Sequence, residues 1–400
     1  MKKKVFTIMV TIYAIALVIG CSNETEEEPY LWKIEGNVLV KYEGKNEDVI
    51  IPAEVKEIGD GAFTYHTNLK SLTINDGVTK IGSSAFWGCF IETVKYNGTL
   101  AQWLSMEDCG DLMQAASSVI MTDVYDMKYR PDLVIPNGMT SISNGAFRRC
   151  QFKDVTIPNS VVSIGDFAFS YCQGFATVTI PDSVTNIGNF AFQNTGLINL
   201  NIPSRLTSIG YSAFNYCTKL TSVVISGGVT SIGDYMFSDC NSLVYVDIPD
   251  SLSSIGEHAF QGCKSLKSVT IPDSVTSIMD GAFQECTSLK IMKIPNEVTK
   301  IEDNMFSGCT SLESVTIHDS VTSIGGTAFY GCTSLTSVVI PDDVTKINWY
   351  TFRGCMNLTS VTIPKSIREI CVDAFNGCDK LKTVYYKGTK EDMGKNRGYR

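Results

Sequence analysis

The sequence predicts a right-handed, mostly β repeat solenoid of about 13–14 coils of 22–23 residues, with parallel strands and short turns. A phenylalanine recurs every 22 or 23 residues along most of the chain, and apolar residues occupy the same places around it. The stretch before each recurring proline alternates polar and apolar residues, which is typical of strands. Such self-similarity indicates coils that bury their apolar faces against one another.

The first residues have the layout of a bacterial export signal. Lys2, Lys3 and Lys4 precede a mostly apolar run that ends in Gly20 and Cys21. The run is too short to span a membrane comfortably. Its order resembles the lipobox of bacterial lipoproteins, which implies a signal peptide over 1–20 and membrane attachment through lipid on Cys21. A simple signal peptide followed by a coincidental cysteine is the alternative.

Residues 21–29 are polar and acidic, so they are expected to form a solvated tether between lipid and fold. Ser22, rather than an aspartate, follows Cys21, which resembles outer-membrane lipoproteins. The acidic cluster also resembles the surface-export signal of some Gram-negative lipoproteins, although a plain hydrophilic spacer is an equally simple interpretation. The expected location is lipid-anchored, at the outer membrane and facing the cell surface.

The rest of the chain divides according to the repeat. We expect an N-terminal cap over 30–55, first repeats over 56–93, a modified repeat or insertion over 94–133, regular repeats over 134–383 and a C-terminal cap or tail over 384–400. The repeat phenylalanines are Phe63, Phe86, Phe147, Phe169, Phe192, Phe214, Phe237, Phe260, Phe283, Phe306, Phe329, Phe352 and Phe375. In register, they would form a continuous aromatic spine.

A typical unit shows the physical logic of the repeat. Residues 268–271 alternate polar and apolar, which predicts a strand with Val269 and Ile271 facing the core. Pro272 lacks an N–H group and therefore ends the strand. Phe283 is expected to fill the interior of the coil, where it is stabilised by contact with neighbouring coils.

Eleven cysteines lie three residues after a repeat phenylalanine, and Thr195 and His66 take that place in two other units. With one cysteine per coil and no partner position, we expect buried free thiols that donate weak hydrogen bonds to backbone carbonyls. Disulfides are the alternative in an exported protein. Metal binding would need clustered ligands, and none occur. Cys109 and Cys371 have no assigned role.

The unit Leu-x-x-Val-x-Ile-Pro-x-x-Val-Thr-x-Ile-Gly-x-x-Ala-Phe-x-x-Cys resembles the BspA-like, or treponemal-type, leucine-rich repeats. The resemblance covers most of residues 30–390, and residues 31–51 resemble the opening cap of that family. It implies a leucine-rich-repeat solenoid in a bacterial cell-surface or secreted protein that binds macromolecules, some members of the family acting in adhesion to host proteins. The expected function is recognition of an extracellular macromolecule or adhesion to a host protein or glycan. It identifies no ligand.

The spacing from Phe86 to Phe147 is much longer than one repeat. Residues 96–103 open an insertion that continues as helix-like sequence to about residue 116, followed by strand-like residues 118–121. The family often carries such a segment, and residues 386–389 begin the same motif again. We interpret the insertion as a modified coil bulging from the solenoid. Long insertions often carry function, so Tyr96 and Trp103 mark a candidate insertion site.

The outward side chains of the strands form a candidate ligand face, because solenoid strands commonly bind extended partners. Most are small hydroxyl residues, and these could equally be soluble β-formers without a binding role. Tyr245 and Tyr385 are favoured because aromatic residues dominate binding energies. The candidates are Thr177, Thr179, Tyr245, Asp247, Ser268, Thr270, Lys293, Thr316, Thr362 and Tyr385.

Charge and motif content narrow the function class. The net charge of −9 argues against nucleic acid as a partner. Removal of residues 1–20 would make the charge still more negative, because that segment contains three lysines and no acidic residue. His66, His258 and His318 lie far apart, and no nucleophile–base pair, phosphate loop or metal cluster occurs, so we expect no enzyme, no catalytic residue and no cofactor. A periplasmic scaffold is the alternative, and ordered-water or ice binding is a remote one.

Overall fold

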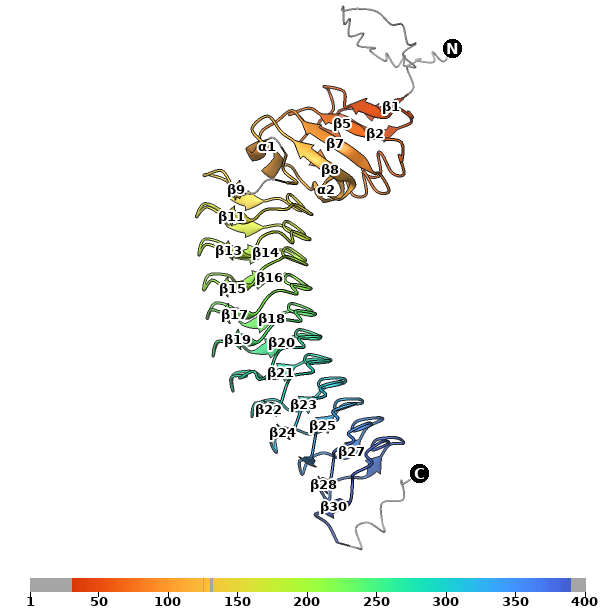
Figure 1. Cartoon of the computed structure of the whole chain (residues 1–400), viewed down its shortest axis with the longest axis vertical. Coiled ribbons are helices and arrows are strands. Elements are labelled where there is room, and N and C mark those ends of the chain that lie inside the picture. The colour runs from red at the N-terminus through yellow and green to blue at the C-terminus, as the bar shows by residue number, and fades with distance from the viewer. Residues whose placement is uncertain (1–30, 125, 130–131, 390–400) are drawn as a thin grey trace, which may run out of the picture.

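The computed structural model describes residues 31–124, 126–129 and 132–389, and it confirms the predicted parallel-stranded solenoid. Figure 1 shows coils stacked along a curved rod with the two ends of the chain at opposite ends. The predicted signal peptide, Cys21 and the acidic tether lie outside the described residues. In the described ranges, no helix has both the length and the apolar character needed to cross a membrane.

The rod begins with a hairpin. Strands β1 (Trp32–Glu35) and β2 (Val38–Tyr42) pair antiparallel, and β2 then pairs in parallel with the first coil. One row of short strands follows on that side, β4 (Glu57–Ile58) and β6 (Lys80–Ile81). The other side carries a parallel sheet of β3 (Asp48–Ile50), β5 (Ser71–Ile74), β7 (Ile91–Tyr96) and β8 (Ala116–Ile120).

The later coils repeat the same two-sided plan. The longer strands are β9 (Asp132–Val134), β11 (Asp154–Thr156), β13 (Thr177–Thr179), β15 (Asn199–Ile202), β17 (Ser222–Ile225), β19 (Tyr245–Asp247), β22 (Ile291–Lys293), β24 (Ser314–Thr316), β26 (Ser337–Val339), β28 (Ser360–Ile363) and β30 (Thr383–Tyr386). The two-residue strands are β10 (Ser141–Ile142), β12 (Ser163–Ile164), β14 (Asn186–Ile187), β16 (Ser208–Ile209), β18 (Ser231–Ile232), β20 (Ser254–Ile255), β21 (Ser277–Ile278), β23 (Lys300–Ile301), β25 (Ser323–Ile324), β27 (Lys346–Ile347) and β29 (Glu369–Ile370). All pairs among these coils are parallel, so the chain always returns in the same direction.

The prediction of a strand over 268–271 is wrong, because no strand forms there although its alternation of exposed and more buried residues is present. A Cβ atom at Gly256 would lie 2.7 Å from the backbone nitrogen of Asp234. Met279 occupies the glycine place in the next coil, where its N–H still donates to the Ile255 carbonyl over 3.0 Å, so the coils stay paired on that side. Strands of about three residues make few hydrogen bonds to each neighbour, so a small displacement removes the pairing.

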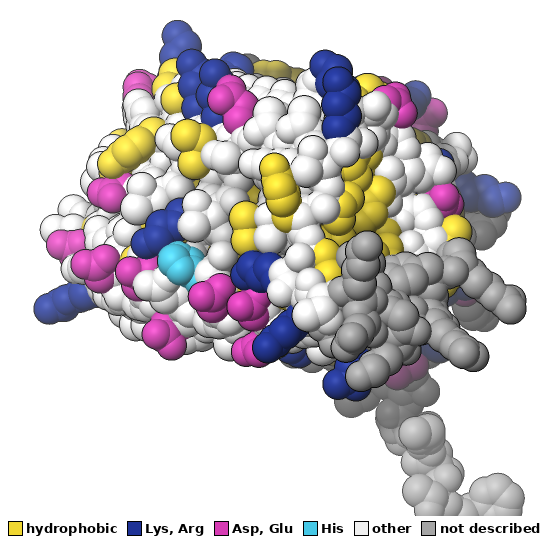
Figure 2. Space-filling view, turned by 90° about the horizontal axis from the view of Figure 1, so that it is seen from below, with side chains coloured by type: hydrophobic (Ala, Val, Ile, Leu, Met, Phe, Trp, Pro, Cys, Tyr) yellow, Lys and Arg dark blue, Asp and Glu magenta, His cyan; other side chains and the backbone are white. Residues whose placement is uncertain are grey.

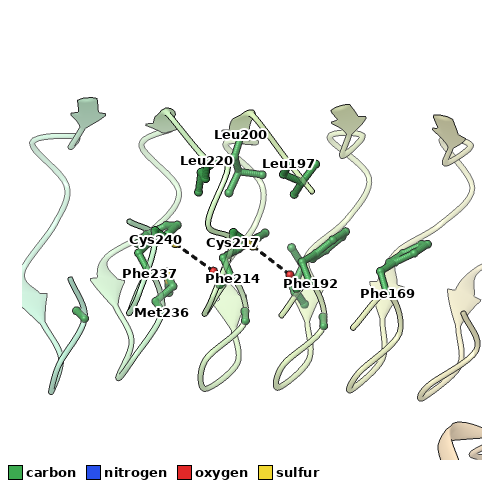
Figure 3. Packing of buried hydrophobic residues seen from close by; sticks show 14 of the residues in the cluster. Phe169, Phe192, Leu197, Leu200, Phe214, Cys217, Leu220, Met236, Phe237 and Cys240 are labelled. Atoms are coloured by element: carbon green, nitrogen blue, oxygen red, sulfur yellow. Dashed lines mark hydrogen bonds between the residues drawn. The ribbon is translucent and has the colours of Figure 1, made fainter. Parts of the chain in front are cut away.

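The repeat phenylalanines form the predicted spine over most of the rod. From Phe147 to Phe375, each ring stacks on the next with centroids 5.2–5.9 Å apart. Figure 3 shows part of this stack, with leucine side chains packed around it. The expected continuity is wrong at one place, because Phe63 stacks on Phe86 but the insertion separates Phe86 from Phe147.

The predicted thiol hydrogen bonds are confirmed, with one refinement. Ten of the eleven thiols, all but that of Cys150, donate to the carbonyl of the repeat phenylalanine in the preceding coil, as Cys217 does to Phe192 at 3.2 Å (Figure 3). The same bond joins Cys286 to Phe260 at 3.2 Å. Thr195 lies 3.1 Å from the Cys217 sulfur rather than on a carbonyl. All cysteines in the described part of the chain are free thiols.

The turns around the phenylalanines are joined by three backbone hydrogen bonds per coil, which we call rungs. Their donors are the N–H groups two residues before the phenylalanine, at the phenylalanine, and two residues after it. Gly61, Phe63 and Tyr65 donate in this way to the next coil, over 3.0, 2.8 and 2.8 Å. The two outer donors have positive φ in most coils, whether or not they are glycine, as in Tyr171 with φ 63°.

The last coil leaves an apolar surface at the end of the rod. Figure 2 views the molecule from that end, where hydrophobic side chains gather in the middle and charged side chains surround them. Val372, Val384 and Tyr385 are exposed there, and a shallow hollow follows residues 370–376.

Candidate functional site

The insertion is one modified coil that stays within the solenoid. Its strand β8 pairs in parallel with β7, as a regular coil would. Between them lie two short helices, α1 (Leu100–Leu104) and α2 (Gly110–Ala115). Thr99 begins α1 with a capping box, because its side chain accepts from the N–H of Gln102 while the Gln102 side chain accepts from the N–H of Thr99.

The two residues that mark the insertion in the sequence are structural in position. Tyr96 and Trp103 are both buried, and their rings meet edge to face at 5.5 Å. The indole Nε1 of Trp103 donates to the Ala146 carbonyl at 3.1 Å. Neither side chain is therefore exposed to a ligand at the surface. The groups of the insertion that a ligand could contact belong to other residues.

The helix α2 lies where a phenylalanine turn would be, so the rungs are interrupted. On the far side, the three acceptors of the coil of Phe147 have substitute donors. The Cys109 N–H reaches the Asn144 carbonyl at 3.2 Å, the Trp103 indole reaches Ala146, and the Lys128 ammonium reaches the Arg148 carbonyl at 3.0 Å. Cys109 thus has a role that the sequence did not reveal, and its thiol also reaches Asn144 at 3.5 Å.

In the coil of Phe86, which precedes the insertion, the N–H donors of the rungs are left without partners within the part of the chain that the structure describes. The rung donors of this coil are the N–H groups of Ser84, Phe86 and Gly88. Among the described residues, these three N–H groups have no hydrogen-bond acceptor. The interruption is therefore asymmetric, since its acceptors are satisfied by other side chains and backbone whereas its donors are not.

A pocket of about 670 Å³ lies at this interruption. Three aromatic side chains in its lining are strongly exposed, with Trp87 at 52%, Phe90 at 75% and Tyr129 at 67%. Polar side chains complete the wall, namely those of Asp111, Gln114, Ser117, Lys128, Arg149 and Gln151. The pocket therefore combines apolar ring surfaces with hydrogen-bonding and cationic groups, which is the composition of a binding site.

Two cations, Lys128 and Arg149, line the pocket, and Arg148 is the chain neighbour of Arg149. Lys128 is buried, donates to the Met113 and Arg148 carbonyls, and has its pKa lowered by burial. Burial, and then the neighbouring Arg149, lower the pKa of Arg148. Arg149 is exposed, and its guanidinium lies over the Tyr171 ring at 5.9 Å. This concentration of positive charge is notable in a chain with a net charge of −9.

The strand-face candidates are surface residues with one exception. Tyr245 and Tyr385 are among the exposed hydrophobic side chains, and Thr362 is half-buried. Lys293 forms an exposed ion pair with Asp273 at 3.7 Å. The face is divided into several short sheets, so it does not present one uninterrupted array. Its role in binding stays a prediction. The candidates that remain exposed are Thr177, Thr179, Tyr245, Asp247, Ser268, Thr270, Lys293, Thr316 and Tyr385.

Sequence reasoning missed a row of aromatic side chains along the turns. Phe167 and Phe190 stack at 4.8 Å, and the row continues through Tyr211 and Tyr235 to His258. These residues lie two or three positions before consecutive repeat phenylalanines. The sequence therefore contained the signal for this row, namely an aromatic residue near the same place in five consecutive coils. Those places are variable positions of the repeat.

The coils, spine and thiol bonds together define a leucine-rich-repeat solenoid. The chain belongs to the family described as BspA type leucine rich repeat region, which it matches in six copies over residues 34–105, 140–267 and 255–382. Residues 106–139, which contain α2, β8, Lys128 and Tyr129, lie between the matched ranges. The pocket is therefore built partly from sequence that the family pattern does not describe.

Solved structures of other bacterial proteins are also similar to this chain. A leucine-rich repeat protein from Bacteroides ovatus is 25% identical, over 90% of this chain and 91% of that one, with a TM-score of 0.47. A leucine rich cell surface protein from Faecalibacterium prausnitzii is 23% identical, over 94% and 100%, with a TM-score of 0.45. The pneumococcal vaccine antigen PcpA is 19% identical, over 91% and 93%, with a TM-score of 0.45. No curated protein sequence matches the chain.

Proposed function

We propose that this protein is a lipid-anchored recognition protein that binds an extracellular protein or glycan at the cell surface without catalysing a reaction. The observation that carries the proposal is that the repeated residues have structural roles, whereas the variable residues are exposed at the surface. The repeated residues are used in the core, the thiol bonds and the rungs, whereas the variable residues supply exposed aromatic, cationic and hydroxyl groups for non-covalent contacts.

The anchored location rests on the sequence before the fold. A basic segment, an apolar run, Gly20 and Cys21 follow one another in the order of a lipoprotein signal. The acidic residues over 24–28 would then hold the rod away from the lipid. A scaffold inside the periplasm, attached in the same way, is the second candidate, and it differs in orientation rather than in chemistry.

Proteinase treatment of intact cells distinguishes the two locations. The surface proposal expects loss of the full-length protein while a soluble periplasmic control protein survives. Survival of this protein until the envelope is broken would exclude adhesion and favour the periplasmic scaffold. The experiment uses the native chain, so it does not depend on knowing the ligand.

The anchor is tested by a single substitution. Cys21→Ala removes the thiol that would carry lipid, so labelling with an alkyne fatty acid should be lost and the protein should leave the membrane fraction. Cys371→Ala is the matched control, because Cys371 belongs to the folded part, where it donates to Glu369 at 3.4 Å. Retained labelling in the Cys21→Ala protein would show that the lipid is absent or placed elsewhere.

A further inference from the structure

The pocket at the interruption offers hydrogen-bond donors without matching acceptors. The N–H groups of Phe86 and Gly88 belong to residues in its lining, and neither has an acceptor among the described residues. On the far side of the interruption, the carbonyls of Ala146 and Arg148 are already bonded to Trp103 and Lys128. Because an unmet backbone donor that loses water costs free energy, the pocket favours a ligand rich in acceptors.

The arrangement of these donors is that of a backbone edge. In the preceding coil, the N–H groups of Phe63 and Tyr65 donate to the carbonyls of Ala85 and Trp87, which are also two residues apart. Gly88 repeats this geometry one coil later with φ 77°, at the same place in the turn as Tyr65. An extended peptide carries carbonyls that point in one direction at every second residue, which is the spacing that these two donors require.

The side chains that line the pocket determine which peptide side chains bind there most favourably. Arg149 is exposed at the pocket, and buried Lys128 lies beside it, while Asp111 is the acidic residue of the lining. An acidic side chain is therefore favoured next to Arg149. The exposed rings of Trp87, Phe90 and Tyr129 provide apolar surface for neighbouring side chains of the ligand.

We propose that this pocket binds an extended, acidic peptide segment of a partner protein, whose backbone carbonyls accept from the open N–H groups of the interrupted turn. The peptide would lie between the turn of Phe86 and the helix α2, with its acidic side chain paired to Arg149 and its apolar side chains on the exposed rings of Trp87, Phe90 and Tyr129. This inference deepens the proposed recognition function by naming the ligand class and the site.

The test starts from purified residues 22–400 and a phage-displayed library of random peptides, with a glycan microarray run in parallel. We expect enriched peptides that carry an acidic residue between apolar ones. Arg149→Gln should weaken binding of such a peptide at least about tenfold, the loss typical of one charge-assisted contact. Arg205→Gln is the matched control, because it removes the same charge from an exposed residue outside the pocket lining and should leave binding unchanged.

Backbone recognition is tested on the peptide, so that the protein fold is untouched. An amide-to-ester scan of the selected peptide weakens individual carbonyl acceptors, and it should reduce affinity at alternate positions only. Thermal unfolding of Arg149→Gln, and of a second variant, Trp87→Ala, checks that both proteins are folded. A uniform response to the scan, or unchanged binding in both variants, would overturn the proposal.

The remaining outcomes separate this inference from the proposed function. Peptides that lose affinity in Tyr245→Ala but not in Arg149→Gln would bind the strand face, which overturns the pocket assignment and supports recognition. Glycans bound through Arg149 would overturn the peptide class and keep the site. Absence of binding to both libraries would overturn the peptide proposal, while proteinase treatment of cells would still report the location.

Discussion

At the scale of single residues, side chains complete hydrogen bonds that the backbone leaves open. Trp103 and Lys128 donate to carbonyls that a regular turn would satisfy with its N–H groups. The thiols do the same for carbonyls inside the coils. These bonds matter because a buried carbonyl without a donor costs more than the same bond contributes when it is made.

Trp103→Phe tests the role of the indole. The substitution keeps an aromatic ring but leaves the Ala146 carbonyl without its donor, so the free energy of unfolding should fall by roughly 1–3 kcal/mol. Chemical denaturation monitored by circular dichroism measures the change. Trp349→Phe is the control, because Trp349 is 53% exposed and its loss should change stability by less than about 0.5 kcal/mol. Equal effects in the two variants would contradict the assignment.

The buried thiols should be unreactive in the folded protein. Burial raises the pKa of Cys89 to about 11 and that of Cys309 to about 12. Only the thiolate is alkylated, so at about pH 8 reaction should be slow in the native state and should approach completion after unfolding without reductant. Mass spectrometry of alkylated peptides gives both values. Cysteines that stay unmodified after unfolding would reveal disulfides instead.

Single-residue roles were the hardest to predict. The sequence indicated thiol-to-carbonyl bonds, because the cysteine recurs with the repeat and has no partner of its own kind. It could not show that Cys109 and Lys128 serve a neighbouring coil, since that depends on where an irregular segment returns in space. Tyr96 and Trp103 were expected to mark a binding site, whereas both are buried.

At the scale of elements, the stacked phenylalanines are the main source of cohesion between coils. From Phe169 to Phe352, each ring stacks on the ring before and after it, and leucine side chains pack against the part of the stack shown in Figure 3. The periodic sequence predicted this arrangement because the same residue types recur at the same positions of each coil and are therefore buried in the same way. The absence of a strand over 268–271 was not predictable from alternation, because the alternation is present there without the backbone pairing.

Phe283→Ala should therefore be costly. It removes a fully buried ring from the middle of the stack and should lower the free energy of unfolding by roughly 3–5 kcal/mol. Tyr245→Ala, at an exposed aromatic of the strand face, should change stability by less than about 0.5 kcal/mol. Denaturant titration of both variants gives the comparison, and a neutral Phe283→Ala would show that the spine assignment is wrong.

At the scale of the whole molecule, the insertion divides the rod into two blocks. The sheet of the first block ends at β8 and the next sheet begins at β9, while the aromatic stack stops at Phe86 and resumes at Phe147. Contacts in a solenoid are between neighbours, so cooperativity is lowest where the neighbouring interface is irregular. The jump in phenylalanine spacing indicated the place of this division, but not the pocket that it creates.

Native-state hydrogen exchange should detect the division. Backbone amides in β3, β5 and β7 are expected to exchange together, with a free energy of opening below that of amides in the central coils around Phe237. Mass spectrometry of peptic fragments resolves the two groups. One common opening free energy over both blocks would contradict this and show that the insertion transmits cooperativity fully.

The asymmetry of the interruption also has a mechanical consequence. In the anchored arrangement that we propose, any force that pulls on the coils beyond the insertion is opposed by the lipid at the other end, so tension passes through the insertion. There the load is carried by the side chains of Trp103 and Lys128 and a few backbone bonds, instead of by the repeating rungs. Under load, the interface at the insertion would therefore separate first. The distal coils would stay folded, because the extension of the chain at the insertion relieves the tension on them.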